Sequence, residues 1–342
     1  MSRVAYQVGP SSEQQPACCP SVDPIAEWRP GATIPSGRRI SIQISMLFTW
    51  RAWMYPKLFG LAVAAIALAS LACGISFDLP ITEITAGPTI TDQIEVPFPE
   101  TPGGPVDLIL EFGLGELNLA PGDREGLVHG IVTYNIADFK PQVRVSGSRV
   151  RLGMGELEIK GIPDFGDRYI NEWDIKLGPA PLNLEINAGG YKGRFELGGL
   201  ALHSLRLSEG ASDVRLEFAR PNMVEMESFK YQSGASSVEM VGLANANFTD
   251  MEFKSGAGNY SLDFSGELQR DCTVTIDTGF SNLTIIVPQG VSARVFYDGG
   301  LGNVDVGGGW QKSGDNYLLS GNGPTITIKV NLAAGNLELR TR

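Results

Sequence analysis

Histidine and cysteine are scarce in this sequence. Its 342 residues include two His and four Cys, the latter being Cys18, Cys19, Cys73 and Cys272. No CxxC spacing occurs, and both zinc sites and disulfide frameworks need more sulfur or histidine than the sequence offers. The sequence therefore predicts no metal site, no disulfide scaffold and no cofactor.

Positive charge is also in short supply. There are 27 Lys and Arg residues against 38 Asp and Glu, which gives a net charge of −11. Of the acids, only Glu13, Asp23 and Glu27 precede residue 73, so the rest of the chain is strongly acidic. Phosphate backbones and anionic headgroups repel such a surface, which disfavours nucleic-acid binding and electrostatic docking on lipid.

Glycine, by contrast, is abundant, with 42 residues against 21 Pro. The glycines follow no three-residue period, which excludes collagen. Glycine in this amount beside many Val, Ile, Leu and Phe residues indicates short strands joined by tight turns.

One uncharged run stands at residues 58–72, which read LFGLAVAAIALASLA. Arg51 and Lys57 precede it and Cys73 follows it, the layout of a secretory signal. The junction resembles a bacterial lipobox, in which the cysteine is acylated and becomes the new N-terminus. We therefore expect an export signal over 46–72 and lipidation at Cys73, which would anchor the chain at the outer face of the cytoplasmic membrane or in the cell envelope.

Two other outcomes stay open for this segment. The uncharged run continues to Phe77, which is long enough to span a bilayer as an uncleaved helix. Ala67-Leu68-Ala69 offers an A-x-A site for cleavage and release. Residues 1–45 show no periodicity and are interpreted as a disordered lead or a start-site artefact. Residues 73–105 are predicted to form an extended tether.

A glycine phrase recurs along the second half of the chain at intervals of about 22 residues. Each copy has a glycine, a small residue and a turn residue, followed by alternating apolar and polar positions. This alternation is the period of a strand with one buried face, and the repeat length is that of a solenoid rung. The copies are GGYKGRFEL, GASDVRLEF, GASSVEMVG, GAGNYSLDF, GFSNLTIIV, GLGNVDVGG and AAGNLELRTR.

The sequence thus predicts an all-β fold. Residues 189–342 are expected to form a parallel β-solenoid, a single-stranded right-handed β-helix with rungs of about 22 residues. Residues 106–188, which contain the related phrases FGLGELNL and LGMGELEI, are expected to form an irregular β cap at its first end. Arg340 to Arg342 should blunt the far edge, and residues 307–324 should form a projecting hairpin.

Several phrases resemble the toast-rack domain family, which groups with putative adhesins and with the C-terminal region of cell-wall-active antibiotic response proteins. They are GLGEL, TYNIADFKPQV, GASDVRLEF, GLANANF and GAGNYSLDFSGEL, and the resemblance covers nearly all of residues 106–342. It implies a β-solenoid on an envelope protein, generally without assigned chemistry, and it brings no catalytic residues with it.

Candidate catalytic groups are few. His129 and His203 lie in strand-like runs without a neighbouring nucleophile or paired carboxylate, and we interpret both as strand residues. Cys272 should point inward and be inert. Many glutamates, Glu239 and Glu252 among them, alternate with apolar positions as on a solvated strand face. The sequence therefore favours a protein that is not an enzyme.

The function that fits best is a non-catalytic module of the cell-envelope surface, for adhesion, scaffolding or interaction with an envelope protein or polysaccharide. Trp310 and Tyr317, in the 307–324 segment, are candidate surface contacts, although core packing of the last rung explains them nearly as well. One alternative is an envelope-stress sensor whose retained helix at 58–77 meets a membrane partner. Another is a polysaccharide-processing β-helix enzyme. The oligomeric state stays open.

Overall fold

The computed structural model describes residues 2–3, 7–8, 81–83, 86–100, 104–122, 126–155, 162–164 and 169–342. The predicted signal segment and the lipidation site at Cys73 lie outside the described residues. Every described strand belongs to one unit of the chain, made of residues 1–11 and 81–342. Among the described residues, no helix is both long enough and apolar enough to cross a bilayer.

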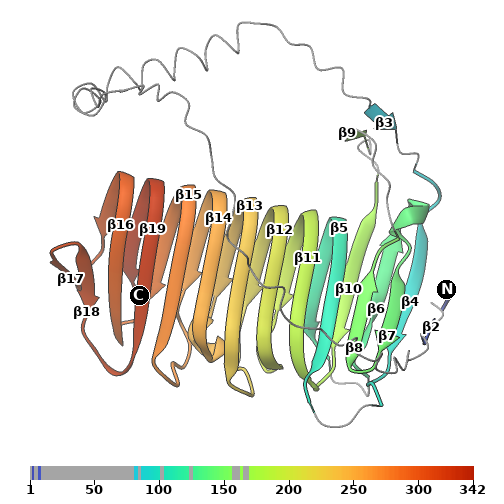
Figure 1. Ribbon diagram of the computed structural model, residues 1–342, viewed down its shortest axis with the longest axis horizontal. Coiled ribbons are helices and arrows are strands. Elements are labelled where there is room, and N and C mark those ends of the chain that lie inside the picture. Colours follow the sequence, from blue (N-terminus) through green and yellow to red (C-terminus); the bar gives the residue numbers. More distant parts are fainter. Residues whose placement is uncertain are drawn as a thin grey trace, which may run out of the picture. The chain divides into compact units, whose positions relative to one another are not determined.

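Most of this unit consists of long strands stacked side by side as rungs (Figure 1). Neighbouring rungs pair in parallel and in register, so that Val214 lies beside Val238, and Val238 beside Tyr260. This confirms the predicted all-β fold and its repeat, while the hand of the coil stays a prediction. The regular rungs are β5 (Val106–Pro121), β11 (Pro181–Glu196), β12 (Ala201–Glu217), β13 (Met226–Val241), β14 (Phe248–Asp263), β15 (Cys272–Val287), β16 (Gly290–Val306) and β19 (Gly321–Thr341).

Each rung turns a corner at the same place in the repeat, where the phrase has its first glycine or, in β19, Ala333. Phe253 lies before the corner of β14 and Tyr260 after it, yet their ring centroids are only 5.0 Å apart. The two halves of a rung therefore face each other across the interior. Glycine is required at this corner because a Cβ on Gly256 would lie 2.5 Å from the carbonyl oxygen of Gly234 in the rung below.

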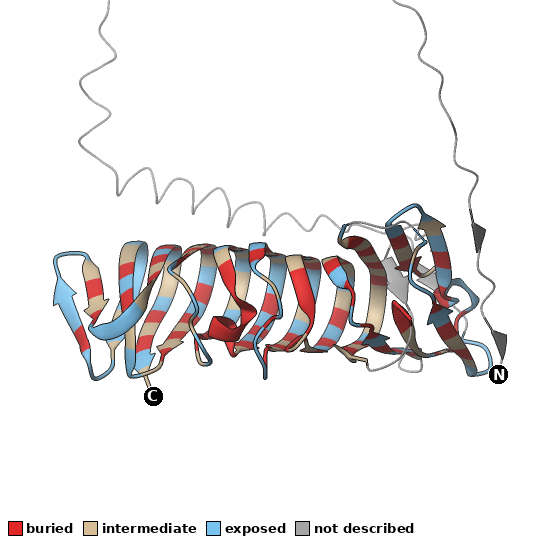
Figure 2. Ribbon diagram, turned by 90° about the horizontal axis from the view of Figure 1, so that it is seen from below, coloured by how far each residue is buried: buried red, intermediate tan, exposed pale blue. Residues whose placement is uncertain are grey.

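The core fills the space between the two halves. Along the strands, buried and exposed residues alternate (Figure 2), as expected from the period of two. Tyr231 stacks on Phe253 of the next rung with ring centroids 4.7 Å apart. Phe218 and the short 3-10 helix η3 (Leu243–Ala246), which lie in connections between rungs, are also buried. Burial of this kind contributes about 1.5–3 kcal/mol per large apolar side chain.

The order of rungs at the C-terminal end differs from the order of the chain. The last strand, β19, pairs with β15 on one side and with β16 on the other. The prediction that Arg340 to Arg342 would blunt the far edge is therefore wrong. The far edge is formed by β16 and by the hairpin of β17 (Trp310–Ser313) and β18 (Asn316–Leu319). The predicted hairpin is confirmed, and β18 pairs antiparallel with β16.

The N-terminal end of the stack also differs from the prediction. β5 pairs with β11 along both of its halves, so it is a regular rung rather than part of an irregular cap. The predicted boundary after residue 188 falls inside β11, because the phrase FGLGELNL is itself a rung corner. On the other side, the two halves of β5 pair with β8 (Arg149–Gly153) and β10 (Asn171–Leu177).

The remaining strands extend the sheet beyond β10 and beyond β8. β6 (Val128–Tyr134) pairs with β10, and β4 (Ile90–Val96) with β6, both antiparallel. The predicted tether is therefore wrong for β4, because Ile94 and Val96 alternate with polar residues and are buried in the sheet. The other elements are β7 (Gln142–Ser146), η1 (Ala137–Phe139), β3 (Ile81–Glu83) paired with β9 (Ile162–Asp164), β1 (Ser2–Arg3) and β2 (Gln7–Val8).

Candidate functional site

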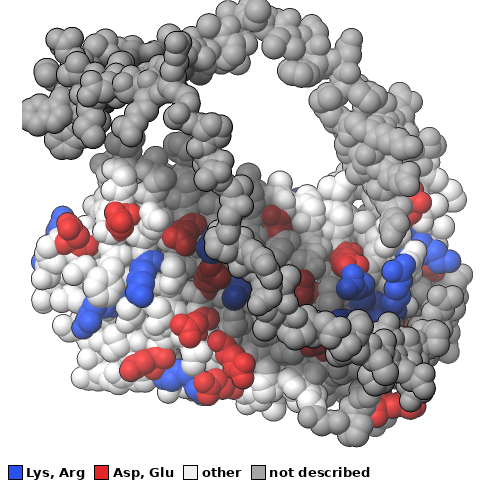
Figure 3. All heavy atoms as spheres, in the orientation of Figure 1, with Lys and Arg blue, Asp and Glu red and all other residues white. Residues whose placement is uncertain are grey.

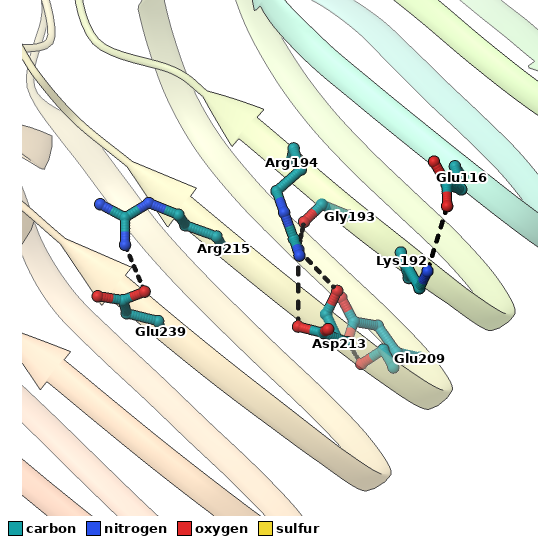
Figure 4. Close-up of polar contacts among 9 residues, drawn as sticks. Glu116, Lys192, Gly193, Arg194, Glu209, Asp213, Arg215 and Glu239 are labelled. Atoms are coloured by element: carbon teal, nitrogen blue, oxygen red, sulfur yellow. Dashed lines mark hydrogen bonds and ion pairs between the residues drawn. The ribbon is translucent and has the colours of Figure 1, made fainter.

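The surface available for interaction is the outer face, by which we mean the side chains that follow each corner and point away from the core. On rungs β5 to β13 this face is charged, and basic and acidic side chains of neighbouring rungs pair (Figure 4). Such exposed pairs contribute only about 0–1 kcal/mol each, so they serve solubility and register more than stability. The pairs are Lys192–Glu116 at 3.3 Å, Arg194–Asp213 at 3.6 Å, and Arg215–Glu239.

On rungs β14, β15 and β19 the same face becomes uncharged at one position, where amides replace the ions. Asn282 Nδ2 donates to Asn259 Oδ1 at 2.9 Å, and Asn336 Nδ2 donates to Asn282 Oδ1 at 2.8 Å. Asn303 of β16 lies in register beside Asn336. We call these four residues the asparagine ladder. Since an amide has two donors and two acceptor lone pairs, the ladder retains capacity for further hydrogen bonds.

Beside the ladder lies a short apolar ridge, formed by Phe280, Ala334 and Leu301. Phe280 is 73% exposed and Leu301 is 79% exposed. Both pair in register with Ala334, which lies between them on β19. Phe280 and Leu301 are thus two strand spacings, or about 10 Å, apart. Two large apolar side chains this exposed, with only Ala334 between them, mark a candidate interaction site.

A shallow groove of about 450 Å³ runs along the other side of the ridge. It crosses β13, β14, β15 and β19 just before their corners, and its walls are mainly amide and hydroxyl groups. Its only charged side chains are Lys254 and Asp277, which have opposite signs. We call it the corner groove, and it is lined by Gln232, Ser233, Lys254, Ser255, Asp277, Thr278, Gly279, Asn331 and Ala333.

Over the wider surface in Figure 3, acidic and basic side chains are interspersed and neither sign forms a continuous field. Among the described residues, one area departs from this charged pattern. It consists of the corner groove, the apolar ridge and the asparagine ladder. All three features extend across neighbouring rungs, so their residues follow one another at the spacing of the strands.

Comparison with known families identifies the first part of this fold. Residues 87–240 match the family model described as the N-terminal domain of toast_rack. Residues 87–240 thus belong to the toast-rack family as its N-terminal domain. The match includes the N-terminal strands and the charged rungs up to β13, whereas the asparagine ladder and the apolar ridge lie beyond it.

The chain is also similar to solved structures. One is described as a putative cell adhesion protein from Clostridium sporogenes, with 17% identity, a TM-score of 0.42, and coverage of 75% of this chain and 100% of that chain. Another is described as a putative adhesin from Bacteroides fragilis, with 13% identity, a TM-score of 0.40, and coverage of 75% and 99%. No curated protein matches the chain.

The interior of the toast-rack rungs contains a carboxylate that the sequence did not single out. Glu209 lies just before the corner of β12 and is buried. Its carboxylate accepts hydrogen bonds from Tyr191 Oη at 2.5 Å, Ser212 Oγ at 2.5 Å and Tyr231 Oη at 2.9 Å. Desolvation raises the pKa of Glu209 and also those of both tyrosines. Its hydrogen bonds join three neighbouring rungs, so we assign it a structural role.

The predicted contacts Trp310 and Tyr317 occupy the hairpin at the far edge. Trp310 is only 8% exposed and Tyr317 only 3%. Trp310 Nε1 donates to the carbonyl of Arg340 at 3.5 Å, and Lys312 Nζ lies 5.7 Å from the Tyr317 ring centroid. Their surface role stays a prediction, and their burial favours the alternative in which they pack against the last rungs.

The remaining candidates lie where strand residues are expected. His129 is half-buried in β6, and His203 is half-buried at a bulge in β12. Cys272 is 4% exposed, and burial, with a smaller effect from Asp271, raises the pKa of its thiol to about 12. A thiol of this pKa is unreactive at neutral pH. No group of three His, Cys, Asp or Glu residues in the described part of the chain could hold a metal ion.

Proposed function

We propose that this toast-rack protein is a non-catalytic interaction module on the outer surface of a bacterial cell, held there through an acylated Cys73. The observation that carries the proposal is the exposed apolar ridge of Phe280, Ala334 and Leu301 on a rigid stack of rungs. Leaving a Phe and a Leu in water gives no stability to the stack, so their exposure needs a reason other than folding.

The acidic side chains of the outer face support a non-catalytic role. Glu116 and Glu172 are neighbours in register beside a hollow of about 310 Å³, the arrangement that two-carboxylate hydrolysis would need. However, the carboxylate of Glu116 is already engaged in an ion pair with Lys192 of the neighbouring rung at 3.3 Å.

Two experiments test the proposal. Mass spectrometry of the mature N-terminus should find a diacylglyceryl group on Cys73, and an intact residue 58–77 segment would instead favour the membrane-helix alternative. Purified mature protein should bind envelope preparations of its own bacterium, and F280A should weaken that binding. Hydrolysis of an envelope polysaccharide that is abolished by E116Q or E172Q would refute the non-catalytic proposal.

A further inference from the structure

We infer that the corner groove, the apolar ridge and the asparagine ladder form one binding site for an uncharged polysaccharide chain. The inference rests on the proposed function and names the class of ligand. The chemical groups at the site, their spacing, and the lack of charged side chains on the ridge and the ladder support it.

The chemical groups match those of a sugar. A pyranose ring has apolar faces of C–H groups and an edge of hydroxyls that both donate and accept hydrogen bonds. Phe280, which is 73% exposed, offers an aromatic face against which a C–H face can pack. On one side of it, Asn282 and Asn336 offer amide donors and acceptors, and on the other, the exposed amides of Gln232 and Asn331 line the corner groove.

The spacing matches a chain that lies along the stack. Ladder and groove residues recur once per rung, at a step of about 4.8 Å, which is close to the length of one sugar unit in an extended glycan. The groove crosses four rungs, from β13 to β19, and so covers three steps, or about 14 Å. Successive sugars of an extended chain would meet equivalent groups on successive rungs, over about three to four units.

Charge favours a neutral polymer over an anionic one. The ridge and the ladder carry no charged side chain. In the groove, Lys254 forms an ion pair with Glu252, which leaves the carboxylate of Asp277 to repel an anionic ligand. The whole chain has a net charge of −11, which would repel a polyanion approaching along the stack. Basic side chains of the outer face, such as Arg215 on β12 and Arg340 on β19, are paired with acids.

A second copy of the chain is a poorer fit to the same surface. A stable protein interface buries about 800 Å² on each partner, whereas one exposed aromatic side chain supplies about 150–250 Å². The ridge has a single aromatic residue, Phe280, and its neighbours Ala334 and Leu301 are smaller. A ligand that uses hydrogen bonds from the ladder and the groove as well as the ridge fits better.

The test is calorimetric titration of the mature protein with neutral β-linked oligosaccharides of two to six units, with polygalacturonate as the anionic control. Affinity should rise with length up to about four units and then level off, because the groove spans about three rung steps. F280A should weaken binding about tenfold or more, as loss of an aromatic anchor does. N282A and N336A should weaken it too. M223A is the matched control, because Met223 is 71% exposed on a connection between rungs, and it should bind as the wild type does.

The outcomes separate this inference from the proposed function. If envelope preparations bind the wild type more strongly than F280A but no neutral oligosaccharide binds, the glycan inference is wrong and the proposed function stands. If F280A binds envelope and oligosaccharides as the wild type does, both are wrong. Sedimentation that shows a dimer lost in F280A would overturn the glycan inference in favour of self-association. Unchanged thermal unfolding of F280A would show that lost binding is not lost folding.

Discussion

Removal of the buried carboxylate of Glu209 should destabilise the stack. In Glu209→Ala, the hydroxyls of Tyr191 and Tyr231 lose their acceptor inside the core. Tyr231 Oη can turn to Ser236 Oγ, which lies 3.1 Å away, whereas Tyr191 Oη has no second side-chain partner of this kind among the described residues. An unsatisfied buried hydroxyl costs about 1–3 kcal/mol, and with the lost packing we expect about 2–5 kcal/mol.

The pH dependence gives a sharper test of the same site. Desolvation raises the pKa of Glu209 in the folded state. The Glu209 carboxyl group therefore keeps its proton to a higher pH in the folded protein than in the unfolded chain. Its contribution to stability is therefore fully present below the ordinary carboxyl pKa and is lost as pH rises through the raised value. Glu209→Gln cannot titrate, so it removes this dependence and leaves all other acids in place.

The assay is urea unfolding of the wild type and of E209Q across the acidic to neutral range. The unfolding free energy of the wild type, relative to E209Q, should fall as pH rises. A difference that rises with pH would refute the reasoning, since it would mean that the three hydroxyl donors outweigh desolvation and lower the pKa of Glu209. Y191F, which removes one donor only, should cost about 1 kcal/mol.

Three further predictions concern the frame around the site. Gly256→Ala should lower the unfolding free energy by about 1–3 kcal/mol, because the added Cβ would meet the carbonyl oxygen of Gly234. Gly308→Ala should leave it unchanged, because a Cβ there meets nothing within 4 Å. Equal effects of the two substitutions in urea unfolding would contradict the corner geometry. Truncation before β19 should expose β16 to β18 to protease while β5 to β14 stay protected, and protection of β16 would contradict its dependence on β19. Trp310→Ala should destabilise the far edge by about 3–5 kcal/mol in thermal or urea unfolding. If this variant keeps the stability of the wild type but binds envelope preparations poorly, Trp310 is a surface contact rather than a packing residue.

The repeat made most of the fold predictable. Val214 and Val238 stand at equivalent places in the phrases GASDVRLEF and GASSVEMVG, and they pair directly. What the repeat could not reveal is the order of rungs at the ends. The phrases around Gly300 and Ala333 both fit beside β15, since their apolar positions are equivalent, so periodicity alone does not show that β19 lies between β15 and β16.

The site was less predictable than the frame. Glu209 continues the inward alternation of Leu205 and Leu207, so the period of two already places it in the core. It was missed because glutamates were assigned to the solvated strand face by their charge. Phe280 and Leu301 occupy the place in the phrase where most other copies have Ala. A large apolar residue at this position was the sequence signal for the ridge. Trp310 and Tyr317 attracted attention as aromatics, but aromatic residues in a terminal hairpin are as useful for packing as for contact.

The most direct measurement is photo-cross-linking in intact cells from a benzophenone side chain placed at position 280, compared with the same group at position 223. If the ridge is where the stacked rungs meet their ligand, position 280 should give a saccharide-containing adduct that position 223 does not. Equal labelling from both positions, or an adduct from position 223 alone, would contradict a functional outer face on β15, β19 and β16.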